Sequence, residues 1–269
     1  RDQTGNLEDT PAVVDTITIV ALDATPPTTT VTASPGPNVN SWNNTDVIVT
    51  LSAVDNDGGT GVKEISYSLS GAQTDGGVVA GSGGSVTIAA EGETALTYFA
   101  WDNAGNQEAP QILAIRIDKT PPAVTPGPNA NGWNNTDVTA HFEATDSLSG
   151  IQGASFFDVF FAEEGADQSA TRTFTDLAGN STSATVSGIN IDKTPPAITG
   201  SQTPGPNPNG WNNTDVTVSF NCSDGLSGVE SYSAPMTLTA EGAGQSSTGT
   251  AEDKAGNRAT ATVSGINID

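Results

Sequence analysis

The sequence is poor in the residues that usually carry covalent cross-links, cysteine–histidine metal sites and acid–base catalysis. Among its 269 residues there is one cysteine, Cys222, and one histidine, His141. A single cysteine cannot form a disulfide within the chain, and this pair cannot supply the ligands of a zinc site. We find no Ser-His-Asp set and no phosphate-binding glycine loop before a helix pattern, so we expect no enzyme.

Basic residues are also scarce. The chain has 8 lysines and arginines against 31 aspartates and glutamates, which gives a net charge of −23. Nucleic-acid binding needs a basic surface, so we exclude nucleic acid as a partner. The acidic surplus leaves two interpretations. It is either a solvated, self-repelling surface that keeps the chain soluble and extended, or a set of carboxylates of which some bind a cation.

Apolar residues are too few for one large core. Hydrophobic residues make up 35% of the chain and aromatic residues 6%. This content suits several small domains with thin cores. No run of 18 apolar residues occurs, so we predict no membrane span.

What the sequence has in abundance is internal repetition. The phrase Trp-Asn-Asn-Thr-Asp-Val occurs three times, at Trp42–Val47, Trp133–Val138 and Trp211–Val216. The phrase Asp-x-Ala-Gly-Asn keeps the same order, at Asp102–Asn106, Asp176–Asn180 and Asp253–Asn257. Such self-similarity marks a tandem array.

A third phrase, Ile-Asp-Lys-Thr-Pro-Pro, gives the boundaries between the units. It stands at Ile117–Pro122 and Ile191–Pro196, with a looser copy at Leu22–Pro27. We therefore predict three domains, residues 23–117, 118–191 and 192–269. Residues 1–22 match only the end of a unit, so we predict that they form the C-terminal strand or strands of a preceding or incomplete unit. We interpret the chain as an excerpt or a processed form of a longer protein.

The residues after each Trp-Asn-Asn-Thr-Asp phrase predict a strand. Apolar and polar residues alternate along Val138–Thr145, and the same alternation occurs in Val47–Val54 and Val216–Ser223. Period two over eight residues is typical of a strand with one buried face. This pattern places Cys222 in the core as a small buried residue and His141 on the solvent face.

Further alternating segments complete the pattern of a sandwich. We predict about seven short strands in each unit and find no helical period, so the fold class is all-β, with tandem immunoglobulin-like β-sandwich domains in an elongated rod and a partial N-terminal unit. The first unit carries a glycine-rich insertion around Gly71–Gly84, which we interpret as a mobile loop or an extra hairpin.

The order of these motifs resembles the bacterial Ig-like repeats of large cell-surface and secreted proteins. The resemblance runs from Thr-Pro-Pro through Trp-Asn-Asn-Thr-Asp and Asp-x-Ala-Gly-Asn to the closing Ile-Asp, and it covers essentially the whole chain. It implies an extracellular or cell-surface location. Such modules serve as stalks, adhesin shafts, cell-wall spacers and accessory domains of secreted enzymes, so the resemblance is specific for fold and less so for function.

The topology of an Ig-like sandwich predicts where acidic loop residues meet. The B–C and F–G loops lie at the end where the chain enters, so carboxylates from both loops should converge with the aspartate of each joint. The predicted sets are Asp23, Asp55, Asp57 and Asp102; Asp118, Asp146 and Asp176; and Asp192, Asp224 and Asp253. Facing the last set across its joint we expect Asn134, Asn135, Asp137, Glu163 and Glu164.

Two interpretations of these carboxylates stay open. Three or more carboxylates with asparagine carbonyls nearby suit Ca²⁺, which takes six to eight oxygen ligands. Alternatively, each aspartate caps its own turn through its backbone and holds no ion. The Thr-Pro-Pro segments stiffen the joints in either case, because tandem prolines favour an extended conformation.

Tryptophans and glycosylation motifs supply the remaining candidate sites. The tryptophan of each repeated phrase is expected to be structural, whereas Trp101 is unique to the first unit and is the better candidate for contact with a ligand. Candidate glycosylation sites are Asn43, Asn134, Asn180, Asn212 and Asn221.

The function that best fits the sequence is a non-catalytic extracellular structural repeat array, such as a stalk, surface-layer or fibre component, whose joints bind Ca²⁺. One alternative is a self-assembling filament subunit in which Thr16–Leu22 completes a sheet of a neighbouring subunit by strand addition. Another is an adhesin or carbohydrate-binding accessory module. The expected partners are neighbouring repeats of the same chain or neighbouring subunits.

Overall fold

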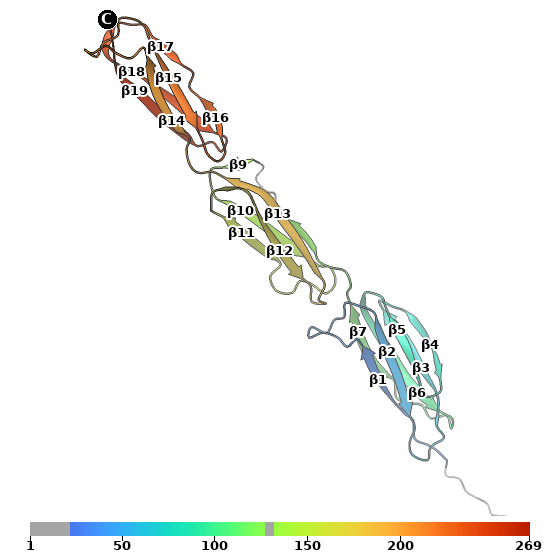
Figure 1. Ribbon diagram of the computed structural model, residues 1–269. Helices are drawn as coiled ribbons and strands as arrows, with labels where there is room; N and C mark the ends of the chain where they lie inside the picture. The colour runs from blue at the N-terminus through green and yellow to red at the C-terminus, as the bar shows by residue number, and fades with distance from the viewer. Residues whose placement is uncertain (1–21, 127–131) are drawn as a thin grey trace, which may run out of the picture. The chain divides into compact units, whose positions relative to one another are not determined.

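A computed structural model describes residues 22–126 and 132–269 (Figure 1). Every regular element in these residues is a β-strand, which confirms the all-β fold class. None of the described residues belongs to a helix that could cross a membrane. The chain divides into two compact units, of which the first ends at Asp118 and the second begins at Lys119.

The first unit is a sandwich of two antiparallel sheets. One sheet has the order β1-β2-β5, and its strands are Thr28–Ser34, Val47–Val54 and Gly83–Ile88. The other has the order β4-β3-β6-β7, and its strands are Asp75–Ala80, Val62–Gly71, Gly92–Asp102 and Gln111–Ile117. The glycine-rich insertion forms β4, which pairs with β3 as an extra hairpin.

The second unit contains two sandwiches. In the one nearer the N-terminus, one sheet has the order β11-β10-β8, with strands Phe156–Phe161, Val138–Thr145 and Ala123–Pro126. The other has the order β12-β13-β9, with strands Gly165–Thr175, Ser181–Ile191 and Trp133–Asn134. We call this the second sandwich and the sandwich of the first unit the first.

The third sandwich ends the chain. One of its sheets has the order β14-β15-β17, with strands Ala197–Thr203, Val216–Ser223 and Met236–Leu238. The other has the order β16-β18-β19, with strands Val229–Tyr232, Gly242–Asp253 and Arg258–Ile268.

Each sandwich encloses its own hydrophobic cluster. The strands β2, β10 and β15 have the bounds that the alternation predicts, and their inward residues are buried, as with Leu51 at 1% exposure and Phe142 at 0%. Burying such a side chain contributes roughly 1.5–3 kcal/mol. Cys222 is half-buried, although the sequence predicted a buried core residue. It lies next to the last residue of β15, where the core ends.

The first asparagine of each Trp-Asn-Asn phrase connects the segment before the B strand, which is β2, β10 or β15, to the last strand of its sandwich. Asn43 forms a parallel bridge with Ile117, and Asn212 forms one with Ile268. In the second sandwich the same pairing appears as β9 alongside the end of β13. The asparagine backbone therefore extends the second sheet by one short parallel segment in every copy.

Glycines accommodate the one bulky aromatic residue of the third core. Phe220 is 8% exposed, and Gly249 faces it from the opposite sheet. A Cβ atom at Gly249 would lie 2.6 Å from the Phe220 ring. Because a real contact at that distance is not tolerated, the ring fits only beside a residue without a side chain.

We expect Gly249→Ala to destabilise the third sandwich by about 1–3 kcal/mol, because the added methyl group displaces the Phe220 ring. Chemical denaturation measures the loss. In the double variant Gly249→Ala/Phe220→Leu the smaller side chain should recover part of it. If Gly249→Ala is neutral, or the second change adds to the loss, the packing described for Phe220 is wrong.

Candidate functional site

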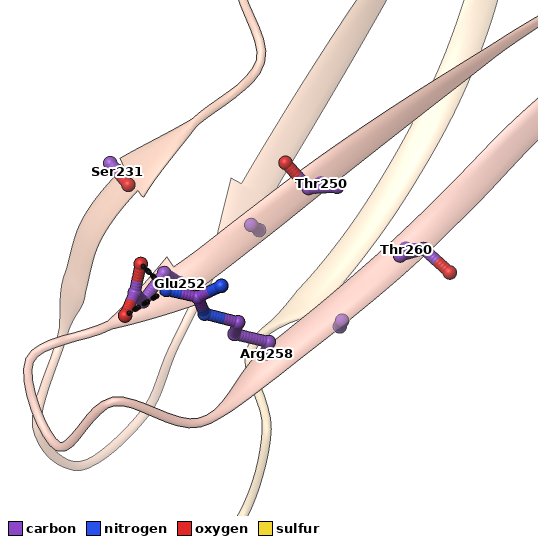
Figure 2. A pocket seen from close by; sticks show the side chains of 7 residues that line it. Ser231, Thr250, Glu252, Arg258 and Thr260 are labelled. Atoms are coloured by element: carbon purple, nitrogen blue, oxygen red, sulfur yellow. Dashed lines mark hydrogen bonds and ion pairs between the residues drawn. The ribbon is translucent and has the colours of Figure 1, made fainter.

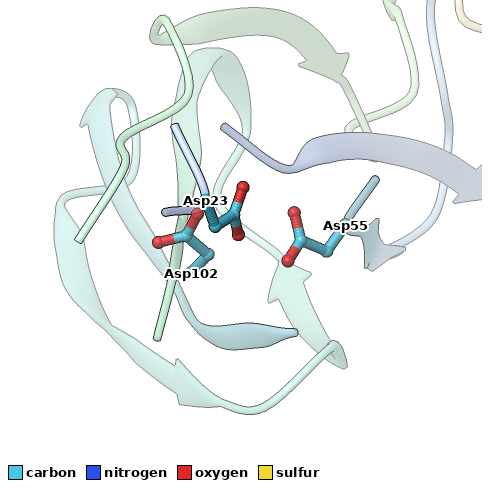
Figure 3. Close-up of side chains that lie close together, drawn as sticks. All are labelled: Asp23, Asp55 and Asp102. Atoms are coloured by element: carbon cyan, nitrogen blue, oxygen red, sulfur yellow. The ribbon is translucent and has the colours of Figure 1, made fainter. Parts of the chain in front are cut away.

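Among the described residues, three groups of aspartates have carboxylate oxygens within 4.8 Å of one another. We call them the Asp triads. They are Asp23, Asp55 and Asp102; Asp118, Asp146 and Asp176; and Asp192, Asp224 and Asp253. Figure 3 shows the carboxylates of the first triad side by side. Asp57, which the sequence placed with the first set, is exposed and is not a member.

The first member of each triad is the joint aspartate before Ala-Thr-Pro-Pro or Lys-Thr-Pro-Pro. In the third sandwich the Asp192 carboxylate accepts hydrogen bonds from the backbone N–H groups of Thr194 at 3.1 Å and Ser227 at 2.9 Å. In the first sandwich Asp23 accepts from the N–H groups of Thr25 at 3.2 Å and Thr60 at 2.9 Å. Asp23 and Asp192 thereby tie their joints to the loops that follow β2 and β15.

The second member follows the B strand and organises that loop. One oxygen of Asp224 accepts from the N–H groups of Leu226 at 3.1 Å and Gly228 at 2.6 Å. Asp146 makes the equivalent bonds to Leu148 at 3.1 Å and Gly150 at 2.7 Å. The loop in the first sandwich is two residues longer, yet Asp55 still accepts from the N–H of Gly61 at 2.7 Å. These bonds are the turn-capping arrangement that the sequence also allowed.

The third member begins the Asp-x-Ala-Gly-Asn turn after the F strand, which is β6, β12 or β18. Asp253 accepts from the N–H groups of Ala255 and Asn257, and its second oxygen accepts from the Asn257 side-chain amide at 2.8 Å. The same amide donates to the main-chain carbonyl of Asp192, also at 2.8 Å. In the first sandwich Asn106 bridges Asp102 and the carbonyl of Asp23 in the same way, at 2.7 Å and 3.1 Å. One amide thus fixes two triad members relative to each other.

The triads concentrate negative charge away from water. Asp102, Asp118, Asp176 and Asp192 are 0% exposed and Asp253 is 1% exposed. Two unit charges about 5 Å apart repel by roughly 3 kcal/mol at an effective dielectric constant near 20. The backbone donors offset part of this repulsion, and a cation would remove more of it.

Hydrogen bonding keeps the joint aspartates ionised. Burial alone would raise the pKa of Asp192, but the hydrogen bonds from Ser227 and Thr194 outweigh it, and the pKa lies below the ordinary value of 3.8. The N–H groups of Thr60 and Thr25 lower the pKa of Asp23 in the same way. Both carboxylates are therefore anionic at neutral pH.

One carboxylate oxygen at the third triad accepts no hydrogen bond from the described residues. Asp224 uses only its Oδ1 atom in the bonds above, which leaves Oδ2. The hydroxyl of Ser227, a residue that is 5% exposed, lies close enough to the Asp192 carboxylate to help lower its pKa, although the geometry between the two groups falls short of a hydrogen bond. A small pocket beside this triad is lined by Glu164, Asp192, Thr194, Asp224, Gly225 and Leu226. A hollow lined by the carboxylates of Glu164, Asp192 and Asp224 is a suitable environment for a hard cation.

Some of the residues predicted to face the joint before the third sandwich contact the Lys193–Thr194 segment. The Lys193 ammonium group binds Asp137, and it also donates to the carbonyl of Ala162 at 2.6 Å. Of the two glutamates predicted in this turn, Glu163 and Glu164, it is Glu164 that accepts from the N–H of Lys193 at 2.6 Å and from the Thr194 hydroxyl at 3.0 Å. Two adjacent glutamates in a turn cannot be distinguished by sequence, because which one faces the joint depends on the turn geometry.

The other predicted joint residues are asparagines. The Asn134 side-chain amide donates to the main-chain carbonyl of Asn190 at 3.0 Å. The main-chain carbonyl of Asn134 accepts from the N–H of Asp192 at 2.8 Å. The Asn135 amide lies 3.7 Å from the position of a Cβ atom at Gly256, in the last Asp-x-Ala-Gly-Asn turn. Both residues therefore lie at the joint, and Asn134 uses its polar groups within its own sandwich.

Candidate ligand and glycosylation residues differ in exposure. Trp101 is half-buried and makes an edge contact with Phe99 at 6.4 Å between ring centroids. Asn43 and Asn212 are 7% and 4% exposed, and their amides donate to main-chain carbonyls. Asn134 and Asn180 are half-buried and also use their amides, whereas Asn221 is exposed. Among these candidates Asn221 presents the most accessible side chain.

Cys222 and His141 are the residues with potential nucleophilic or basic chemistry, and neither is a member of an Asp triad. Burial, with a contribution from the nearby Asp224 charge, raises the pKa of the Cys222 thiol, which disfavours the reactive thiolate. His141 is exposed on β10, where it binds Asp158 at 2.5 Å and stacks on Phe156. Neither arrangement resembles an activated nucleophile with its base.

A shallow pocket on the third sandwich has no feature of a specific site. Figure 2 shows that Ser231, Thr250, Glu252, Arg258 and Thr260 line it. The Arg258 guanidinium group satisfies both oxygens of Glu252 at 3.1 Å. The charged groups of this pocket are thus already paired on the protein surface.

No protein-family model matches the chain, and no curated protein sequence is similar to it. Its structure is similar to that of a 1.5-MDa bacterial ice-binding adhesin, with 14% identity over 92% of this chain and 100% of that chain and a TM-score of 0.38. The fibronectin(III)-like modules of CbhA from Clostridium thermocellum match with 16% identity over 60% of this chain and 95% of that chain, at a TM-score of 0.28. Dimeric latent PorU from Porphyromonas gingivalis matches with 12% identity over 90% of this chain and 34% of that chain, at a TM-score of 0.23. All of these TM-scores are below 0.5, so these likenesses assign no ligand and no function to this chain.

Proposed function

We propose that the chain is a non-catalytic structural repeat array of the cell surface or extracellular space, and that each Asp triad binds one Ca²⁺ ion. The observation that carries this proposal is the recurrence of the same triad in all three sandwiches. The extracellular location rests on the resemblance of the motifs to bacterial Ig-like repeats. A catalytic centre is usually unique in a chain, whereas these carboxylates recur with the same hydrogen bonds.

The chemistry of the triads favours Ca²⁺ over other cations. All three members offer hard carboxylate oxygens, and in the third sandwich the Oδ2 atom of Asp224 accepts no hydrogen bond from a described residue. Zn²⁺ prefers nitrogen and sulfur ligands, and the chain has one histidine and one cysteine. Mg²⁺ demands a near-ideal octahedron, whereas Ca²⁺ accepts flexible geometry with water completing its six to eight ligands.

Binding at a triad would stiffen the joint. Asp192 precedes the Lys-Thr-Pro-Pro segment, while Asp224 and Asp253 belong to the two loops at the same end of the third sandwich. An ion held by all three would fix the joint to both loops. Because the prolines already restrict the segment that follows, we expect the ion to reduce the remaining freedom of the joint.

Ca²⁺ should raise the melting temperature of the full chain relative to the chain in excess chelator. A ligand present at 100 times its dissociation constant adds about 2.7 kcal/mol to the free energy of unfolding. Asp224→Asn should reduce the Ca²⁺-dependent gain of the third sandwich, because it removes one carboxylate yet keeps an oxygen for the N–H groups of Leu226 and Gly228. Differential scanning calorimetry measures both effects.

Glu230→Gln is the matched control, because it removes one exposed charge from the same sandwich. It should leave the Ca²⁺ response unchanged. A parent chain whose melting temperature is the same in Ca²⁺ and in chelator contradicts the proposal. Equal responses of the two variants contradict the role of the third triad.

In chelator, the stability of the third sandwich should depend on pH through Asp192. Its pKa is lower in the folded chain than the ordinary 3.8, so the ionised carboxylate stabilises the fold above that value. This contribution is lost as the pH falls through the folded pKa. Asp192→Asn should therefore be less stable than the parent at pH 7, and the difference should shrink at a pH well below 3.8.

Urea denaturation at a series of pH values tests this dependence. Asp215→Asn, which changes an exposed aspartate of the same sandwich, should show little difference from the parent at either pH. If Asp192→Asn is more stable than the parent at pH 7, repulsion within the triad outweighs the hydrogen bonds, and the pKa argument fails.

A further inference from the structure

In the part of the chain that the structure describes, the second sandwich has no strand equivalent to β3 of the first sandwich or β16 of the third. In the first sandwich β3 pairs with β6 along most of its length, and in the third β16 pairs with the end of β18. In the second, Ile151 forms a single bridge with Asp176, and the N–H of Gln152 donates to the carbonyl of Thr175. The chain then crosses to the other sheet and begins β11. Among the described residues, no strand pairs with this edge of β12 from Ala170 to Phe174.

Backbone groups of β12 point into the empty position. Groups on alternate residues of a strand point to the same side, and the carbonyl of Thr175 points away from β13, toward Gln152. Thr173 and Thr171 therefore present their backbone groups on that side, where the equivalent Phe99 and Thr97 pair with β3. The carbonyl of Thr171 accepts a bond from the Arg172 side chain, and both threonines are exposed. An unpaired edge of this kind is a template for another strand.

The side chains beside this edge are also uncovered. Arg172 replaces the buried Tyr98 of the first sandwich on the inner face, yet it is exposed and forms no ion pair with a described residue. The nearby Phe157 is 44% exposed, and its ring lies 5.7 Å from that of Phe174. Four of the eight phenylalanines of the chain lie within β11. An exposed arginine beside exposed aromatic side chains is a surface that a partner strand could cover.

The register defines the strand that would fit. An antiparallel strand on this edge places one residue opposite Phe174, one opposite Arg172 and one opposite Ala170, all on the inner face. The first and third should be apolar, and the second should carry a carboxylate. Residues opposite Thr171 and Thr173 on the outer face should be threonine or another β-branched residue.

The chain itself contains this pattern outside the described residues. In Val13-Val-Asp-Thr-Ile17 the alternate residues are Val13, Asp15 and Ile17, and the residues between them are Val14 and Thr16. The segment contains no glycine and no proline and consists mainly of β-formers.

We propose that residues 13–17 of a second copy of this chain add to β12 as an antiparallel strand. Val13 then lies opposite Phe174, Asp15 opposite Arg172 and Ile17 opposite Ala170. Main-chain hydrogen bonds supply affinity, and the Asp15–Arg172 pair sets the register. Donor and acceptor are different surfaces, so the contact is heterologous and extends into a chain of subunits unless the rotation closes a ring.

Sedimentation velocity of the full chain over a range of concentrations tests the proposal. The experiment is run in chelator, so that it does not depend on Ca²⁺, and at about 0.15 M salt, where repulsion between acidic copies is screened beyond roughly 8 Å. We expect concentration-dependent oligomers. Asp15→Lys and Arg172→Glu should each weaken association about tenfold or more, and the double variant should regain most of the loss. Lys63→Glu, an exposed charge change on the first sandwich, should have no comparable effect.

A peptide of residues 11–22 is the second arm, because it uses the unaltered chain and is independent of how well a variant folds. It should dissociate the oligomers, and the same peptide with Asp15→Lys should not. A chain that stays monomeric at all concentrations overturns the proposal. So does association that ignores both charge changes, or a peptide that leaves the oligomers intact.

Discussion

In the first and third sandwiches, the arrangement of the end where the chain enters depends on the side-chain amide of the asparagine in Asp-x-Ala-Gly-Asn. In the third sandwich Asn257 donates to the Asp253 carboxylate and to the main-chain carbonyl of Asp192. Asn106 does the same in the first. This amide fixes the turn after the F strand to the segment that enters the sandwich. The variable second position of the motif, which is Asn103, Leu177 or Lys254, takes no part in the bridge.

The same bridge creates an electrostatic constraint. Once the joint and the turn are fixed to each other, their carboxylates lie together with the aspartate that follows the B strand, and most of them are buried. Turn capping and cation binding are compatible explanations, because a carboxylate oxygen that accepts one hydrogen bond still has a free lone pair. The capping bonds place the oxygens, and the surplus of negative charge at each triad is what a divalent cation would balance. In a chain of net charge −23, this is where the opposing charge would have the largest effect.

The sequence predicted the parts of the structure that repeat. Period-two alternation identified β2, β10 and β15 to the residue, because one face of each strand must be buried. The convergence of loop aspartates at one end followed from strand order alone, and the structure brings together each predicted set apart from Asp57. Features that occur in only one of the three sandwiches were harder to predict from the sequence. Whether Asp57 points inward depends on a loop two residues longer, and Cys222 is half-buried because the core ends beside it.

The missing strand of the second sandwich was the largest departure from what the repeats implied. The sequence predicted about seven strands per unit, and residues 151–155 offer no alternation long enough to pair with β12. The absence could be seen only by comparing edges in three dimensions, since the exposed Arg172 and Phe157 are separated along the sequence by a turn and part of a strand.

The most direct measurement of the central claim is the amount of Ca²⁺ bound per chain. The protein is dialysed against buffered Ca²⁺ and then analysed for metal by mass spectrometry, with the same protein in excess chelator as the blank. The account predicts about three Ca²⁺ ions per chain, one for each Asp triad. A chain that retains no Ca²⁺ above the blank at millimolar free ion would contradict it.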